Sequence, residues 1–162
     1  MTTINASTAA TTPKLARQID ARGPRFGAIL TTAVLALTLL TIPSTLSAVL
    51  LTLQAVVFGL GSIVGLHAQP YGIVFRTVVR PRLAAPTTFE DQAPPRFAQA
   101  VGFGFAIVGI VGFATGATVV VYIAVAFALA AAFLNAAFNF CLGCEMYLLG
   151  RRLIPGRSNA AL

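Results

Sequence analysis

The only two cysteines of the chain lie three positions apart, in the motif Cys141-Leu142-Gly143-Cys144. Residues at positions i and i+3 of a helix share a face, so the two thiols can meet. This spacing suits dithiol chemistry or half of a metal site. The alternative is plain packing, since a buried cysteine behaves as a small hydrophobic residue. We take Cys141 and Cys144 as candidate catalytic residues, acting as a redox or sulfur-accepting pair.

Helix position determines how acidic these thiols can be. We expect the last membrane helix to continue through the cysteines to about Leu149, which places the pair near a helix C-terminus. The helix dipole disfavours a thiolate there, so Arg151 and Arg152 would have to offset it. Because Cys144 lies nearer to these arginines and to water, we choose it as the nucleophile. A disulfide within a regular helix would be strained and labile, and Gly143 could ease the distortion.

A metal site is a poorer interpretation of the cysteine pair. Such a site needs about four ligands, and beyond the two thiols the candidate ligands in the chain are His67 and Glu145. His67, the single histidine, lies at the end of an apolar segment, where a capping or hydrogen-bonding role is the alternative to an auxiliary role at the cysteines. We therefore expect no metal site in one chain, and we identify no cofactor.

Three other polar side chains lie within apolar segments: Gln54, Asn135 and Asn139. Intramembrane polar groups usually bond across helices, and the alternative is a path for a small solute. No acidic or basic residue accompanies them, so a proton or ion pathway has no support. Asn135 and Asn139 lie one turn apart on one face of the expected helix, well around the axis from the cysteines.

Two long segments without charge must position these residues: Phe26 to Phe75, and Phe97 to Cys144. The chain is 57% hydrophobic and 9% charged, whereas a soluble domain has about 25% charged residues. A membrane core is crossed by about 20 helical residues. We therefore predict an all-α, polytopic integral membrane protein whose four transmembrane helices form two hairpins. The expected crossings are residues 26–42, 46–65, 97–115 and 117–140.

The basic residues fall before, between and after these segments. They are Lys14, Arg17, Arg22 and Arg25; Arg76, Arg80, Arg82 and Arg96; and Arg151, Arg152 and Arg157. Short loops rich in Lys and Arg stay cytoplasmic, which predicts a multi-pass plasma-membrane protein with both termini cytoplasmic. Topology thus accounts for the net charge of +7, and we expect no nucleic-acid partner.

The remaining segments complete the predicted organisation. Residues 70–80 begin with a proline, and on a helix their apolar side chains fall largely on one side while Arg76 and Arg80 face the polar side. This pattern favours an amphipathic helix on the cytoplasmic surface over an irregular loop. Residues 1–25 are expected to be a disordered basic tail and residues 155–162 a second cytoplasmic tail, flanking a membrane domain over 26–154. Stripes of glycine and alanine predict close helix packing within the chain, with a homo-oligomer as the alternative.

Three motifs resemble a known bacterial membrane family. They are Asp20-Ala-Arg-Gly-Pro-Arg25-Phe26, Pro95-Arg96-Phe97-Ala98-Gln99 and Phe140-Cys141-Leu-Gly-Cys144-Glu-Met-Tyr147. Together they are similar to the mainly actinobacterial family called "domain of unknown function 4395", over about residues 20–153. The family has no established activity. The resemblance implies a thioredoxin-like or rhodanese-like cytoplasmic partner, and it favours a functional role for the cysteine pair.

Three functions from different classes fit these observations. The preferred one is a cytoplasm-facing membrane dithiol, a redox or sulfur-relay component whose basic surroundings attract anionic sulfur species. The first alternative is a small-solute transporter or channel component that uses Gln54, Asn135 and Asn139. The second is a non-catalytic membrane scaffold that anchors a cytoplasmic partner.

Overall fold

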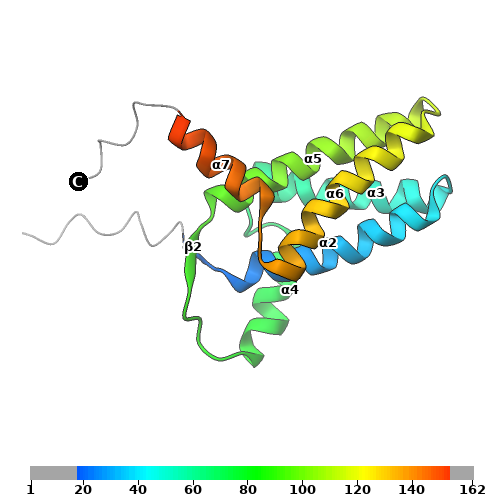
Figure 1. The fold of residues 1–162 in the computed structure, drawn as a ribbon. Coiled ribbons are helices and arrows are strands. Elements are labelled where there is room, and N and C mark those ends of the chain that lie inside the picture. The colour runs from blue at the N-terminus through cyan, green and yellow to red at the C-terminus, as the bar shows by residue number, and fades with distance from the viewer. Residues whose placement is uncertain (1–17, 154–162) are drawn as a thin grey trace, which may run out of the picture.

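Four helices of the computed structural model, which describes residues 18–153, are long and apolar enough to cross a membrane (Figure 1). They are α2 (Arg22–Thr41), α3 (Thr45–Gly59) with its π-helical continuation η1 (Leu60–Val64), α5 (Ala93–Ala114) and α6 (Thr118–Phe138). The predicted all-α, four-helix membrane fold is confirmed. The expected tail over 155–162 and residues 1–17 of the expected N-terminal tail lie outside the described residues.

Each hairpin turns where the sequence cannot continue a helix. α2 ends at Thr41, two residues before Pro43, and the Ser44 side chain then accepts a hydrogen bond from the Ser47 N–H to cap α3. The second turn contains Gly116 at φ +72°, a left-handed conformation that glycine adopts without strain. Both turns lie at the same end of the bundle (Figure 1).

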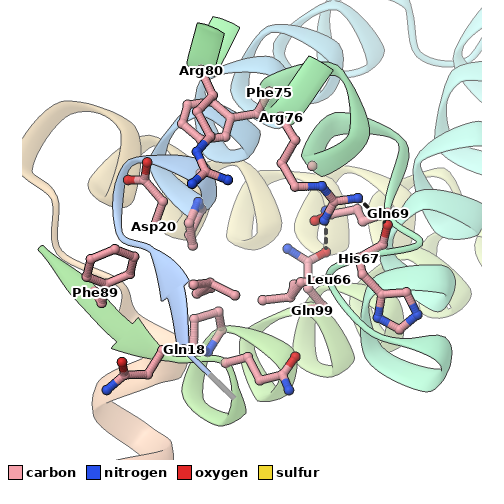
Figure 2. A pocket seen from close by; sticks show the side chains of 16 residues that line it. Gln18, Asp20, Leu66, His67, Gln69, Phe75, Arg76, Arg80, Phe89 and Gln99 are labelled. Carbon is pink, nitrogen blue, oxygen red and sulfur yellow. Dashed lines mark hydrogen bonds between the residues drawn. The ribbon is translucent and has the colours of Figure 1, made fainter. Parts of the chain in front are cut away.

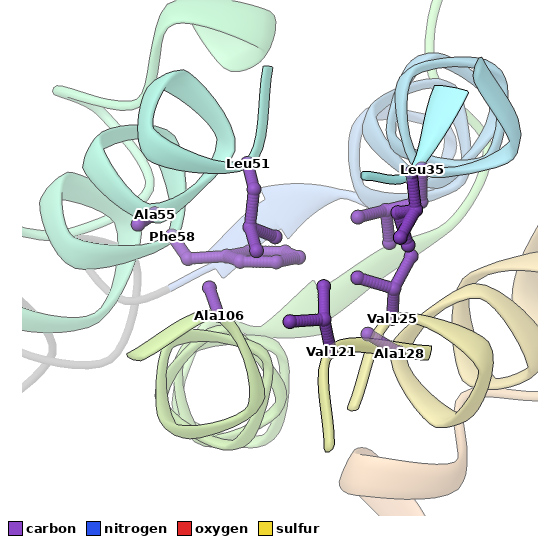
Figure 3. Close-up of a cluster of buried hydrophobic side chains, with 9 residues drawn as sticks. Leu35, Leu51, Ala55, Phe58, Ala106, Val121, Val125 and Ala128 are labelled. Atoms are coloured by element: carbon purple, nitrogen blue, oxygen red, sulfur yellow. The ribbon is translucent and has the colours of Figure 1, made fainter. Parts of the chain in front are cut away.

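The core lies where the four helices meet (Figure 3). Leu35 of α2, Leu51 and Phe58 of α3, and Val121 and Val125 of α6 are almost completely buried there, together with Ala106 of α5. Small residues let α5 approach its neighbours.

The glycines of α5 show how close this approach is. A Cβ atom at Gly102 would lie 2.9 Å from the Phe58 ring, and one at Gly109 would lie 2.7 Å from Leu51. Packing within one chain therefore accounts for the small-residue stripe on α5.

The other end of the bundle, which we call the basic end, holds every arginine in the described part of the chain. Here β1 (Gln18–Asp20) pairs antiparallel with β2 (Phe89–Asp91), and α7 (Leu142–Leu153) follows α6 (Figure 1). Residues 18–25 thus form a strand and the start of α2, although we had assigned them to a disordered tail.

The segment between the hairpins is a short helical run at the basic end. It consists of α4 (Pro70–Val74), the π-helical η2 (Phe75–Val79) and the 3-10 turn η3 (Arg80–Arg82). Phe75 is buried against Phe26, with ring centroids 5.7 Å apart, while Ile73, Val74 and Val78 remain exposed. This pattern is typical of a helix that lies on a membrane surface.

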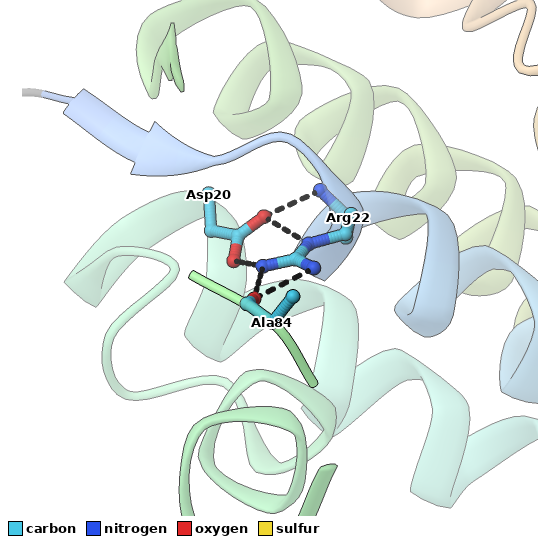
Figure 4. A network of polar contacts seen from close by, with 3 residues as sticks. All are labelled: Asp20, Arg22 and Ala84. Atoms are coloured by element: carbon cyan, nitrogen blue, oxygen red, sulfur yellow. Dashed lines mark hydrogen bonds and ion pairs between the residues drawn. The ribbon is translucent and has the colours of Figure 1, made fainter. Parts of the chain in front are cut away.

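An ion pair fixes the start of α2 (Figure 4). The Arg22 guanidinium donates to both Asp20 carboxylate oxygens, at 2.9 and 3.0 Å, and to the Ala84 carbonyl. Hydrogen bonding from Arg22 lowers the pKa of Asp20, and the nearby charge of Arg80 lowers it further. The contact to Ala84 connects the start of α2 to the loop before β2.

Candidate functional site

The helix that carries the cysteines is broken just before them. α6 ends at Phe138, and Asn139 adopts a left-handed conformation at φ +56° while its N–H donates to the Asn135 carbonyl. This is the αL cap, which asparagine tolerates better than most residues. Our expectation that the fourth helix continues to Leu149 is therefore wrong, because Asn139 ends it and α7 begins as a separate helix.

Cys141 occupies the N-terminal cap of α7. Its carbonyl accepts the Glu145 N–H at 3.0 Å, which is the first backbone bond of the new helix. Its sulfur accepts the Cys144 N–H at 3.3 Å, as the side-chain oxygen of a serine or aspartate cap would. The pair thus lies at a helix N-terminus and not, as we expected, near a C-terminus. The helix dipole here favours a thiolate at Cys141.

The two cysteines are joined as a disulfide in the structure. Their Cα atoms are 5.1 Å apart, within the range that a disulfide bridges. Cys141 precedes the first helical residue, so the bridge spans a helix boundary rather than a regular turn. Both residues are half-buried. Gly143 is therefore not needed to relax a distorted helix.

Gly143 instead lets α7 dock on α5. A Cβ atom at Gly143 would lie 2.7 Å from both Cα and Cβ of Ala98, a distance that real side chains do not reach. Phe97 and Tyr147 add a second contact between the two helices, with ring centroids 5.8 Å apart. Two motifs that are far apart in the sequence, around residue 97 and around residue 143, therefore form one packed unit that holds the disulfide.

An apolar cavity of about 270 Å³ adjoins the disulfide. Its lining comes mainly from α2, α5, α6 and the start of α7, and Cys141 is part of it. Alanine side chains and the rings of Phe58, Phe105 and Phe127 dominate this lining, while Thr31, Gln99 and Asn135 are its polar members. We call this space the apolar cavity.

A second cavity, of about 610 Å³, lies at the basic end between the β-strands, α4 and the start of α5 (Figure 2). His67, Arg76, Arg80 and Asp20 are among its lining residues, and we call it the polar cavity. The two cavities have Pro24, Pro95 and Gln99 in common, so they are neighbours.

The intramembrane polar residues do not line one continuous path. Gln54 is fully buried, donates to the Thr31 hydroxyl oxygen at 3.4 Å and accepts from the Tyr71 hydroxyl at 2.9 Å. Asn135 lines the apolar cavity, whereas Asn139 is an exposed helix cap. Gln54 therefore connects α2, α3 and α4, and the transporter hypothesis gains no support from these three residues.

The expected auxiliary residues lie away from the sulfurs. His67 is exposed and lines the polar cavity, and its carbonyl accepts a hydrogen bond from Arg76. Arg151 and Arg152 are in the last turn of α7. With a rise of about 1.5 Å per residue, they lie roughly 15 Å along the axis from Cys141, beyond the Debye length of about 8 Å at physiological salt. A thiolate at Cys141 would therefore be stabilised by the N-terminus of α7 and not by these arginines.

Sequence reasoning missed two residues that position the site. Arg25 donates from Nε to the Ala136 carbonyl at 3.2 Å, which ties the start of α2 to the last turn of α6. Ala98 forms the surface on which Gly143 packs. Both residues lie in the motifs that carried the family resemblance, which was the available signal. The sequence analysis gave Arg25 only a role in topology and gave Ala98 none.

One of the comparisons with known proteins identifies a family. A family model described as "Domain of unknown function (DUF4395)" matches residues 19–152. No curated protein and no solved structure gave a significant match. The matched region contains all four membrane helices, the disulfide and every lining residue of the two cavities except Gln18. The chain therefore belongs to the DUF4395 family.

Proposed function

We propose that this protein is a membrane-bound thiol–disulfide carrier whose redox centre is the Cys141–Cys144 pair. One observation carries the proposal: Cys141 caps the N-terminus of α7, and its sulfur accepts the Cys144 N–H. In soluble CxxC oxidoreductases, the same placement stabilises the reactive thiolate. A pair that served only for packing would not require a helix N-terminus directed at one sulfur.

Cys141 is the nucleophile in this proposal, in place of Cys144, which we chose from the sequence. The partial positive charge at the start of α7 and the N–H of Cys144 both act on the Cys141 sulfur. Cys144 lies within the first turn, close enough to resolve a mixed disulfide formed at Cys141.

The exchange reaction needs no further reagent than a dithiol or disulfide partner. The Cys141 thiolate attacks one sulfur of a partner disulfide, and the partner's other sulfur leaves as a thiolate. The Cys144 thiolate then attacks the Cys141 sulfur, which forms the internal disulfide and releases the reduced partner. The reverse sequence oxidises a partner dithiol. A thioredoxin-like or rhodanese-like protein would be a suitable partner, and persulfide transfer would use the same two positions.

The pair is placed at the cytoplasmic surface of the plasma membrane in this proposal. All arginines of residues 18–153 lie at the basic end, as do both ends of this region, and arginine-rich short segments stay cytoplasmic. Leu148, Leu149 and Leu153 are exposed on α7 beside Arg151 and Arg152, which is typical of a helix at the bilayer interface. Reporter fusions after Ser44 and Pro86 should read extracytoplasmic and cytoplasmic, respectively, and the reverse result would overturn this orientation.

The test of the redox function compares two single substitutions. Cys144→Ser should leave a reactive Cys141 that is alkylated well below the ordinary thiol pKa of about 8.5 and that traps a mixed disulfide with a thioredoxin-like protein. Cys141→Ser should leave a slowly reacting Cys144 and trap little. Alkylation rates between pH 5 and pH 9, read by mass spectrometry, decide the outcome. Equal, slow alkylation of both variants would contradict the proposal.

A further inference from the structure

Cys141 can also be reached through the apolar cavity, a route that thiol exchange with a protein does not use. It lines the apolar cavity, whose other walls are largely apolar side chains, with alanine and phenylalanine the most frequent. A charged or strongly hydrated thiol reagent would lose its hydration there without compensation. A redox partner that reaches Cys141 through this cavity therefore has to be lipophilic.

The aromatic walls of the cavity favour a flat ring as the ligand. Phe105 and Phe127 stack nearly parallel, with centroids 6.1 Å apart and an interplanar angle of 11°. Phe127 is 61% exposed and Met146 is 50% exposed, so the cavity lining includes side chains on the outer surface of the bundle. A planar ligand can stack against these rings while a hydrophobic tail stays in the bilayer.

A chain of hydrogen bonds ends at this cavity. The Tyr71 hydroxyl donates to Gln54 Oε1, and Gln54 Nε2 donates to Thr31 Oγ1. Thr31 is buried and lines the cavity. Because its oxygen already accepts from Gln54, its hydroxyl proton can be donated to a ligand. A carbonyl oxygen is the natural acceptor for that proton, and the Asn135 side chain can supply another donor.

From these observations we propose that the apolar cavity binds the ring of a membrane quinone, which exchanges electrons with the Cys141–Cys144 pair. This inference rests on the proposed thiol–disulfide function and names its second reactant. A quinone combines the required properties: a planar ring, two carbonyl oxygens, solubility in lipid and a capacity for two electrons and two protons.

The reaction balances without another reagent. Counted from the dithiol, the S–H bonds of Cys141 and Cys144 break and one S–S bond forms, so the pair loses two electrons and two protons. The Cys141 proton leaves first, when its thiolate forms, and the Cys144 proton leaves as the S–S bond forms. The quinone accepts the two electrons, and its two carbonyl oxygens take up the two protons to give a quinol. The Cys141 thiolate, beside the cavity, provides the first contact with the ring, and the Thr31 hydroxyl orients one carbonyl.

The test uses the full chain in lipid nanodiscs with decylubiquinone, whose ring has no unsubstituted position for simple thiol addition. The pair is reduced with dithiothreitol, the reductant is removed, and quinol formation is followed by ultraviolet absorbance. We expect one quinol per chain, with loss of both alkylatable thiols by mass spectrometry.

Two variants test the cavity itself. Ala132→Leu fills it and should slow quinol formation by an order of magnitude or more, whereas Ala130→Leu, at an exposed position of α6, should not. Thr31→Val removes one hydroxyl at nearly constant volume and should slow the reaction by about tenfold, the effect of one hydrogen bond. Thr32→Val is its control, since Thr32 bonds only to the Ala28 carbonyl.

The rate of exchange with dithiothreitol, measured on the same samples, separates the two proposals. If the wild-type pair exchanges with dithiothreitol but forms no quinol, the quinone site is wrong and the thiol function stands. If Ala132→Leu and Thr31→Val both form quinol at the wild-type rate, the reaction occurs outside the cavity and the proposal is overturned. If the wild-type pair does neither reaction, the thiol function and the quinone site both fail.

Discussion

The two cavities at the basic end share a wall but differ in their chemistry. The apolar cavity contains Cys141 and lies among alanine and phenylalanine side chains, whereas the polar cavity contains Arg76, Arg80 and Asp20. At the shared wall, Gln99 Oε1 accepts a hydrogen bond from Gln69 Nε2 at 3.1 Å. The cations of the polar cavity therefore lie on the other side of this wall from the sulfur.

Under the proposed function, this difference favours the helix N-terminus over the arginines as the source of thiolate stabilisation. From the sequence, Arg151 and Arg152 are expected to stabilise a thiolate, but they lie in the last turn of α7, and Arg76 and Arg80 line the polar cavity. The start of α7 replaces them, because backbone N–H groups at a helix N-terminus act at short range and are fixed in direction. Substitutions on the cysteine side should therefore change thiol chemistry, and substitutions on the arginine side should not.

The largest effect should follow from Gly143→Ala, on the cysteine side. Its new Cβ atom would lie 2.7 Å from the Ala98 backbone, so α7 has to move away from α5. Overpacking of this kind costs about 1–3 kcal/mol, and the movement should also slow disulfide exchange. Thermal unfolding in detergent and the rate of reduction by dithiothreitol measure the two effects.

Gly150→Ala is the matched control for this substitution. Gly150 lies on the same helix, and no atom is near its added Cβ, so alanine should leave stability unchanged or raise it by up to about 1 kcal/mol. Equal effects at the two glycines would show that α7 is not docked on α5, and the contrast between the cavities would lose its structural basis.

A smaller effect is expected for Asn139→Ala, which acts on the helix break. Alanine in the left-handed conformation of Asn139 costs about 1–2 kcal/mol relative to glycine. If α6 then extended, Cys141 would no longer cap α7 and its thiol pKa should rise. Asn139→Gly should retain both the stability and the thiol pKa, as measured by alkylation of Cys144→Ser variants. A thiol pKa in Asn139→Ala that stays as low as in Asn139→Gly would argue against the capping explanation.

The fold was predictable because it depends on the composition of long segments and not on single residues. The charge-free segments and the placement of the arginines require two membrane hairpins wherever the exact helix ends fall. The site depends instead on one backbone conformation at Asn139. Asparagine is found both inside membrane helices and at left-handed helix ends, so its presence alone does not predict a break. The close packing of Gly143 on Ala98 is a tertiary contact that the sequence does not reveal.

The β1–β2 pair was missed for a related reason. Each strand has three residues, and its partner lies about seventy positions away, at Gln18↔Asp91. Such short strands have no periodicity that a sequence could reveal. By contrast, the cysteine pair was identifiable from its spacing, although its place at the start of a helix was not.

The smallest effect should come from the polar side, at Asp20→Asn. Hydrogen bonding from Arg22 lowers the folded-state pKa of Asp20 below its ordinary value of 3.8. The stabilisation is therefore complete above that value and is lost as the pH falls through the folded-state pKa. Asp20→Asn should lower the thermal midpoint slightly at pH 7, by less than Asn139→Ala does, and the difference from wild type should shrink towards pH 3.

The same variant tests whether the cavities act independently. Asp20 lines only the polar cavity, so Asp20→Asn should leave the rate of Cys141–Cys144 reduction at the wild-type value across this pH range. Glu145→Gln removes one negative charge at an exposed position of α7, within the first turn. Because a carboxylate near the thiolate repels it, this substitution should increase the reactivity of Cys141 modestly. A change in disulfide reduction that followed the Asp20–Arg22 pair would show that charge in the polar cavity reaches the sulfurs through the wall at Gln99.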